Sequence, residues 1–269
     1  MEIKQFFEKL WADYISMAPR AAQIAALFAA RGELVENDHV AFRTLDMAPL
    51  SLEALEPHLL TMGYTRFAPY YFAEKQLRAW SYLPPEPGLP RIFLSELITS
   101  SFSAELQTTL AKLMAQVDVS RLTSPEVFWA GRLWNPISFS TYERLLAESE
   151  YAAWVATLGL RPNHFTISIN ALQQSRTVEE VIEVVEAAGF VINAAGGKVK
   201  GKPSDLLEQA ATLADRVAVT FADGMREVPS CYYEFALRHR DAAGHLYEGF
   251  VATSADKIFE STYLGSRSS

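Results

Sequence analysis

The sequence predicts one α+β domain in which two β-α-β-β-β units pair to form a half-open barrel. The same order of segments occurs twice, and each copy opens with a histidine in its first strand, His39 and His164. His39 and Gly63 are 24 residues apart, His164 and Gly189 are 25 apart, and an aromatic residue follows each glycine. A segment order that recurs at nearly constant length indicates a duplicated structural unit. The duplication is structural, because few residues match.

Residues 1–35 are predicted to form N-terminal helices, since apolar residues recur there at helical spacing until Gly32. The first β-α-β-β-β unit is predicted at 38–99. Its helix, 51–63, has Ser51 as N-cap. Its strands, rich in aromatic and β-branched residues, are 39–45, 64–72, 76–83 and 91–98.

A helical insert is predicted at 100–160, with helices at 103–117 and 140–158. It shows no chemical motif and is interpreted as scaffold. The second unit is predicted at 161–250, with a helix at 176–189 and strands at 164–170, 190–194, 216–224 and 230–238. Residues 251–269 are interpreted as a C-terminal tail. We expect these parts to form one catalytic domain, 1–269.

Composition excludes several classes of partner. The chain has 269 residues, 49% of them hydrophobic, and a formal net charge of -8, which argues against a nucleic acid or an anionic membrane as partner. Cys231 is the only cysteine, so an intrachain disulfide is impossible and a reducing compartment is expected. No signal peptide and no apolar run of about 18 residues is apparent. We therefore expect a cytoplasmic protein.

Candidate metal ligands follow from the alternation of side chains along strands. His39 and Arg43 share one face of the first strand, while His164 and Glu234 lie in the first and last strands of the second unit. If the units curl into one barrel, these strands can present residues to a common interior. Two imidazoles and one carboxylate form the facial triad of Fe(II) oxygenases, with up to three positions left open. A chelating 2-oxo acid and O₂ could occupy those positions.

Each candidate also has a plainer interpretation. A histidine in an apolar strand can be a hydrogen-bonded core residue, and Glu234 could pair with Arg238. Glu96, interpreted as the first-unit counterpart of Glu234, could be a fourth ligand, a hydrogen-bond partner or a substrate contact. Arg43 could bind a substrate carboxylate with both of its terminal nitrogens, or form a salt bridge with Glu96 or another acid.

Several segments together resemble the 2-oxoadipate dioxygenase/decarboxylase family, over roughly residues 5–262. They are HVAFRTL, RPNHFTISIN, KVKGKPSDLLEQAATLAD followed by RVAVTFADG, VPSCYYEFALR and IFEST. The family is similar to the vicinal oxygen chelate superfold and, in its chemistry, to hydroxyphenylpyruvate dioxygenase. The resemblance implies an Fe(II) centre held by His39, His164 and Glu234, with Arg43 as the catalytic residue that binds the 2-oxo acid. Gln209 is a second candidate for a substrate contact.

The implied reaction converts 2-oxoadipate and O₂ into 2-hydroxyglutarate and CO₂ without an external reductant, in bacterial lysine catabolism. Two other functions fit the same predicted fold. A glyoxalase-type lyase or isomerase would use Glu96 as a fourth ligand and accept Ni(II), Co(II) or Zn(II). A non-catalytic binding protein would hold a small molecule between the units without needing a metal.

Overall fold

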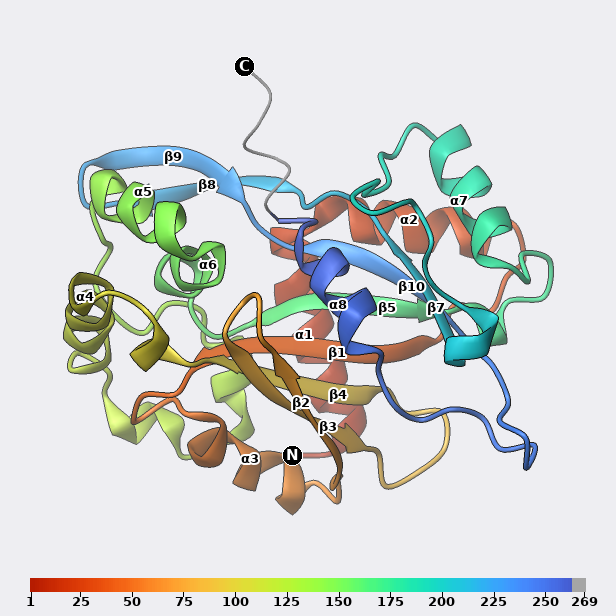
Figure 1. Ribbon diagram of the computed structural model, residues 1–269, viewed down its shortest axis with the longest axis horizontal. Coiled ribbons are helices and arrows are strands. Elements are labelled where there is room, and N and C mark those ends of the chain that lie inside the picture. Colours follow the sequence, from red (N-terminus) through yellow and green to blue (C-terminus); the bar gives the residue numbers. More distant parts are fainter. Residues whose placement is uncertain (263–269) are drawn as a thin grey trace.

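A computed structural model, which describes residues 1–262, contains one curled sheet of eight strands with helices on both of its faces (Figure 1). The predicted half-open barrel of α+β class is confirmed. The order across the sheet is β2-β3-β4-β1-β5-β10-β7-β6. These strands are β1 (Asn37–Leu45), β2 (Thr65–Phe72), β3 (Leu77–Leu83), β4 (Arg91–Leu97), β5 (Pro162–Ser168), β6 (Lys200–Lys202), β7 (Leu207–Ala211) and β10 (Tyr232–Arg238).

The two β-α-β-β-β units join at the centre of the sheet. In each unit the first and last strands lie side by side in parallel, β1 with β4 and β5 with β10. The two first strands, β1 and β5, pair antiparallel and join the halves. The pairing therefore relates the halves by an approximate twofold operation and brings the opening strands of both units together.

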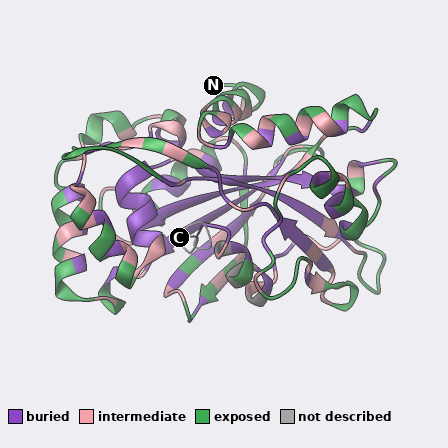
Figure 2. Ribbon diagram, turned by 90° about the horizontal axis from the view of Figure 1, so that it is seen from above, coloured by how far each residue is buried: buried purple, intermediate pink, exposed green. Residues whose placement is uncertain are grey.

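Helices cover both faces of the sheet (Figures 1 and 2). The helices α1 (Ile3–Met17) and α2 (Pro19–Ala30) pack on the outer face, where Tyr14 and Phe28 are buried. The helix α3 (Leu52–Thr61) begins at Ser51 as predicted, and α7 (Val178–Ala187) begins at Thr177 with a capping box. The helix α8 (Ala252–Phe259) lies over the inner face.

The C-terminal segment differs from its prediction. Residues 251–269 were expected to form a tail, but α8 occupies 252–259 and its Ile258 is buried. Residues 263–269 of the predicted tail lie outside the described residues. No helix in the described part of the chain has the length and apolar character needed to cross a bilayer.

The predicted insert is helical but divided differently. Besides α4 (Ala104–Met114) and short 3-10 turns, it contains α5 (Phe139–Glu148) and α6 (Glu150–Leu158), where one helix was expected. Ser149 ends α5 because its backbone is extended, and its side chain accepts a hydrogen bond from the Ala152 N–H to cap α6. The insert, interpreted as scaffold, also contacts a candidate site residue, because Glu150 and Trp154 of α6 lie against Arg43.

One predicted strand of the second unit is wrong, and another forms a strand outside the main sheet. Residues 190–194 contain only an isolated bridge from Ile192 to Thr212. The segment 216–224 forms β8 (Arg216–Phe221) and turns into β9 (Gly224–Pro229), and these two strands make a separate hairpin. The main sheet instead uses β7, which pairs with β10, and β6, which pairs with β7. Both form strands although Gly and Ala have low strand propensity.

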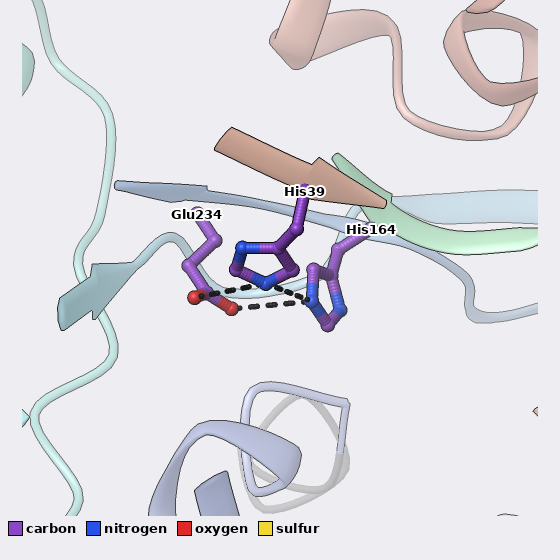
Figure 3. A group of neighbouring side chains, drawn as sticks. All are labelled: His39, His164 and Glu234. Atoms are coloured by element: carbon purple, nitrogen blue, oxygen red, sulfur yellow. Dashed lines mark hydrogen bonds and ion pairs between the residues drawn. The ribbon is translucent and has the colours of Figure 1, made fainter. Parts of the chain in front are cut away.

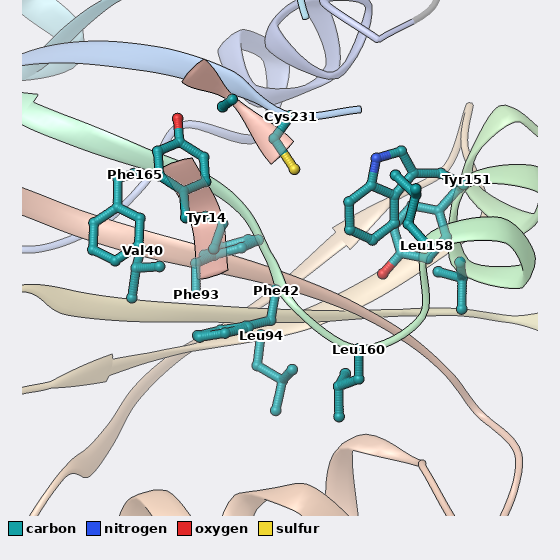
Figure 4. Packing of buried hydrophobic residues seen from close by; sticks show 14 of the residues in the cluster. Tyr14, Val40, Phe42, Phe93, Leu94, Tyr151, Leu158, Leu160, Phe165 and Cys231 are labelled. Atoms are coloured by element: carbon teal, nitrogen blue, oxygen red, sulfur yellow. The ribbon is translucent and has the colours of Figure 1, made fainter. Parts of the chain in front are cut away.

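Much of the hydrophobic core lies between the outer face of the sheet and α1, and the same cluster continues into the insert and to Phe93 on the inner face (Figure 4). Phe42 of β1 packs against Phe128, with ring centroids 4.8 Å apart, and Phe165 of β5 packs against Trp11 and Tyr14. Two of the largest fully buried side chains are arginines, Arg43 and Arg238. A buried guanidinium needs acidic or carbonyl partners. Both arginines therefore point to buried polar networks.

Candidate metal centre

The register of the central strands brings three distant residues to the inner face of the sheet. His39 pairs with Thr166 in β5, and Thr166 pairs with Glu234 in β10, so these three residues form one row across the sheet. His164 lies in the adjacent row, opposite Ala41. All three predicted ligands thus converge, and each of these residues is 4% exposed or less.

The donor atoms of these residues surround one point (Figure 3). His39 Nε2 lies 3.3 Å from His164 Nε2 and 3.5 Å from Glu234 Oε1, while His164 Nε2 lies 3.3 Å from Glu234 Oε2. With metal–ligand bonds of about 2.1 Å, neighbouring ligands of a tetrahedral or octahedral ion are about 3.0–3.4 Å apart. The spacing and the chemistry of this donor set therefore fit a divalent cation.

His39 is oriented by a buried carboxylate that the sequence analysis missed. The pairing of β1 with β5 shifts register between Asn37 and His39, and Asp38 Oδ1 lies 2.7 Å from His39 Nδ1. Arg238 donates two hydrogen bonds to Asp38, from Nε at 2.7 Å and Nη2 at 2.9 Å. An imidazole whose Nδ1–H donates to a carboxylate presents its Nε2 lone pair, which is the arrangement typical of metal-binding histidines.

The second histidine has a similar neighbour. Asn163 Oδ1 lies 3.2 Å from His164 Nδ1, so that Nε2 of His164 also points to the centre of the cluster. In both units the residue before the histidine is therefore the partner of its Nδ1, Asp38 in one and Asn163 in the other. That repeated Asx-His pair was present in the sequence and could have identified both residues.

Burial controls the protonation of the cluster. Burial, opposed by Asp38, lowers the pKa of His39, and burial together with the charges of His39 and Arg43 lowers the pKa of His164 well below its usual value. Burial also raises the pKa of Glu234 to about 8, although the hydrogen bond from Gln209 acts in the opposite direction. Both imidazoles are consequently neutral, which is the form that binds metals, and a cation would displace the proton of Glu234.

Asp38 titrates in the opposite sense. Burial alone would raise its pKa, but the charge of Arg238 and the hydrogen bond with His39 outweigh burial and hold the pKa far below its ordinary value. Asp38 therefore remains a carboxylate. The alternative pairing of Arg238 with Glu234 is wrong, because Arg238 binds Asp38.

A small cavity adjoins the cluster. Its volume is about 20 Å³, and its walls include Gln209, Phe93, Phe250 and Ile258 besides the three candidate ligands. That is room for about one water molecule or ion. Gln209 Nε2 donates to Glu234 Oε1 at 2.5 Å, so this predicted substrate contact lies beside the cluster and supports one of its carboxylate oxygens.

Arg43 lies on the same inner face, two rows along β1 from His39. Its Nη1 donates to Glu150 Oε1 at 2.8 Å and its Nη2 to Thr262 Oγ1 at 3.3 Å. Its guanidinium carbon lies 5.0 Å from the ring centre of Tyr151 and 5.2 Å from that of Trp154. The expected salt bridge with an acid is thus present, and the acid is Glu150 rather than Glu96.

Glu96 does not reach the cluster. Its carboxylate accepts hydrogen bonds from the backbone N–H of Leu52 and from Arg78, on the outer face of the sheet. The register also shows that Glu96 is not the counterpart of Glu234. The twofold operation that relates β1 to β5 places Ala41 in the position of Thr166. Ala41 pairs with Phe93 in β4, and Thr166 pairs with Glu234 in β10, so Phe93 occupies the position equivalent to Glu234. A phenyl ring replaces the fourth ligand that twofold symmetry would supply, and the glyoxalase-type interpretation loses its additional ligand.

Comparisons with known proteins find relatives of a single family. Residues 13–243 match the family model described as 2-oxoadipate dioxygenase/decarboxylase. A protein of Oryza sativa subsp. japonica named 2-oxoadipate dioxygenase/decarboxylase, chloroplastic/amyloplastic, is 34% identical over 274 residues, which cover 93% of this chain and 75% of that protein. The Arabidopsis thaliana protein named 2-oxoadipate dioxygenase/decarboxylase, chloroplastic, is 33% identical over 251 residues, covering 84% and 68%.

Solved structures of similar fold were also found. The hydroxyglutarate synthase of Oryza sativa, solved in complex with 2-oxoadipate, matches with a TM-score of 0.91 and 32% identity, covering 96% of this chain and 91% of that one. A protein of Ralstonia eutropha JMP134, placed provisionally in the glyoxalase superfamily, matches with a TM-score of 0.76 and 26% identity, covering 90% and 83%. The second likeness agrees with the predicted vicinal oxygen chelate fold.

Proposed function

The chain belongs to the 2-oxoadipate dioxygenase/decarboxylase family, and we propose that it converts 2-oxoadipate and O₂ into 2-hydroxyglutarate and CO₂. The observation that carries this proposal is the convergence of two imidazoles and one carboxyl group on a buried point of the inner face. Such a site needs no fourth protein ligand, and Phe93 stands where one would be. The reaction balances without an external reductant, because the 2-oxo acid supplies the electrons.

We propose Fe(II) as the metal, held by His39, His164 and Glu234. Fe(II) in this site would offer open coordination positions to a chelating 2-oxo acid and to O₂, and would take part in the reduction of O₂. The protein supplies the rest. Asp38 and Asn163 fix the orientation of the imidazoles, and Gln209 holds one oxygen of Glu234. Burial excludes bulk water from the cluster.

We assign Arg43 to the binding of a substrate carboxylate. Its guanidinium is buried on the same face as the candidate ligands, and the rings of Tyr151 and Trp154 fix its position. A planar guanidinium binds both oxygens of a carboxylate, so it orients an acid better than a lysine would. Glu150 holds Arg43 Nη1 in this structure, and the substrate carboxylate would exchange with it or join it.

The cavity beside the cluster has to enlarge before a six-carbon acid can bind. About 20 Å³ is enough for one water molecule. Phe250 and Ile258 form the wall opposite the sheet, and they belong to the segment that crosses the inner face. Substrate binding therefore requires these two side chains to move away from His39.

We further propose that the reaction serves lysine catabolism and takes place in the cytoplasm. The family resemblance supports the first proposal. The second rests on the single cysteine, Cys231, which is a buried thiol suited to a reducing compartment.

The experiment that tests the function is a single-turnover assay. Protein loaded anaerobically with Fe(II) is mixed with 2-oxoadipate, and O₂ is then admitted. We expect CO₂ and 2-hydroxyglutarate to appear in equal amounts, each limited by the O₂ supplied. Absence of O₂-dependent CO₂ release from metal-loaded protein would refute the proposed activity.

A further inference from the structure

Tyr232 is a buried residue of the inner face to which the sequence analysis gave no role. It is 1% exposed, and its ring stacks on the His164 imidazole with ring centres 4.7 Å apart and planes 25° apart. Its hydroxyl is buried and has no hydrogen-bond partner among the residues that the structure describes. A buried hydroxyl without a partner is costly, so a molecule that binds at this position is a natural partner for it.

The sheet register places Tyr232 between the metal cluster and Arg43. His39, Thr166 and Glu234 form one row, and the next row along β1 contains Ala41, His164 and Tyr232. Arg43 lies one row further along β1. Ala41 carries only a methyl group, so its side chain does not fill the inner face between the cluster and the guanidinium.

The charges around Tyr232 distinguish it from its neighbour Tyr233. Burial is the main cause that raises the pKa of Tyr232, and the acidic and basic residues Glu234, Arg43 and Glu150 also act on its hydroxyl. Tyr233 faces the opposite side of the sheet, where its ring packs near Trp11 and Phe235. Its hydroxyl also has no partner within residues 1–262, but burial alone raises its pKa. Tyr233 is thus a packing residue among aromatic rings. The ring of Tyr232 belongs to a small apolar cluster with Ile258 and two alanines, but acidic and basic residues act on its hydroxyl.

We propose that the Tyr232 hydroxyl binds substrate, donating a hydrogen bond to the distal carboxylate of the 2-oxo dicarboxylic acid, the one that does not chelate the metal. This inference rests on the proposed function. Arg43 already donates to Glu150 and Thr262, so a carboxylate that arrives beside it gains from a second donor. Tyr232 and Arg43 would together select six-carbon diacids over 2-oxo acids with an apolar end.

The test is anaerobic calorimetry on Fe(II)-loaded wild type, Tyr232→Phe and Tyr233→Phe. The two ligands are 2-oxoadipate and 2-oxohexanoate, which has the same chain length but a methyl group in place of the distal carboxylate. For Tyr232→Phe we expect the Kd of 2-oxoadipate to rise about tenfold, equivalent to about 1.4 kcal/mol. The Kd of 2-oxohexanoate should change less than about twofold, and Tyr233→Phe should change neither.

Two controls separate binding from a structural role. Tyr232→Phe should keep the wild-type metal content and should melt no lower than wild type, because the lost hydroxyl makes no bond within the protein. A lower melting temperature, an unchanged Kd for 2-oxoadipate, or an equal loss for both ligands would overturn the inference. If wild type binds 2-oxoadipate equally well with and without metal, or does not bind it, then the proposed function fails instead.

Discussion

Replacing Asp38 by asparagine should weaken both folding and metal binding, because one carboxylate serves two buried groups. Asp38 is 2% exposed, and the Arg238 side chain that it neutralises is 0% exposed. Removing one partner of a buried ion pair typically costs about 3–5 kcal/mol, since the other charge stays buried without compensation. That is a large part of the ~5–15 kcal/mol that stabilises a typical domain. Metal affinity should fall about 10–100-fold, because His39 loses the acceptor that orients it.

Both effects can be measured on the same preparations. Urea denaturation of metal-free protein gives the free energy of unfolding, and competition with a chromophoric chelator gives the metal affinity. Glu248→Gln is the matched control, since Glu248 is 39% exposed and pairs with Arg91, which also contacts Asp38. Because the Glu248 carboxylate is solvent-exposed, its pair with Arg91 should contribute only about 0–1 kcal/mol. If Asp38→Asn equals wild type in unfolding free energy and in metal affinity, the assigned role of Asp38 is wrong.

Three further predictions follow from the site. Metal affinity should rise about tenfold per pH unit from about pH 6 to pH 8 and then level off, since the ion displaces the proton of Glu234, whose pKa burial raises to about 8; a pH-independent affinity would contradict this. Between about pH 6.5 and 8, the metal-free protein should lose stability as the pH rises, because the folded Glu234 carboxyl keeps a proton that the unfolded chain has released. Below about pH 6.5 the lowered pKa values of His39 and His164 act in the opposite sense, so urea midpoints measured between about pH 6.5 and 8 check the sign. Gln209→Leu should lower metal affinity at pH 7 about tenfold, since Glu234 loses a hydrogen-bond donor. As a control, Gln116→Leu, at an exposed glutamine just after α4, should leave the metal affinity unchanged in the same competition assay.

Much of the fold could be predicted from local pattern. The strands around His39 and His164 are short and apolar, and the helices after them begin at side-chain caps and end at glycines, Gly63 and Gly189. These signals depend on neighbouring residues alone. The repeat then placed both histidines in equivalent central strands, and that was enough to bring two of the three candidate ligands together.

The second unit was harder because its strands depend on their partners. The segment KGK of β6 has a glycine at its centre, and LEQAA of β7 is rich in alanine, so neither has the composition of a strand. Pairing with β10 holds β7 in the sheet. Conversely, RVAVTF alternates well but forms a hairpin outside the main sheet.

The counterpart of Glu234 could not be found by comparing segments. Glu96 and Glu234 occupy similar contexts, LSELI and YYEFA. A register difference of one residue reverses the face of a side chain, and only the strand pairing identifies Phe93 as the equivalent residue. The roles of Asp38 and Arg238 depend in the same way on a local shift of register and on a contact between residues far apart in the chain.

The metal content of purified, anaerobically reconstituted protein tests most directly whether three side chains hold one ion. Wild type should bind about one Fe(II) per chain after excess metal is removed, and His39→Ala, His164→Ala and Glu234→Ala should each bind far less while keeping the far-ultraviolet circular dichroism of the folded protein. His245→Ala, at a histidine that is 81% exposed, should bind as wild type does. If the three variants keep the wild-type stoichiometry and affinity, the metal is held elsewhere and the assignment of the site is contradicted.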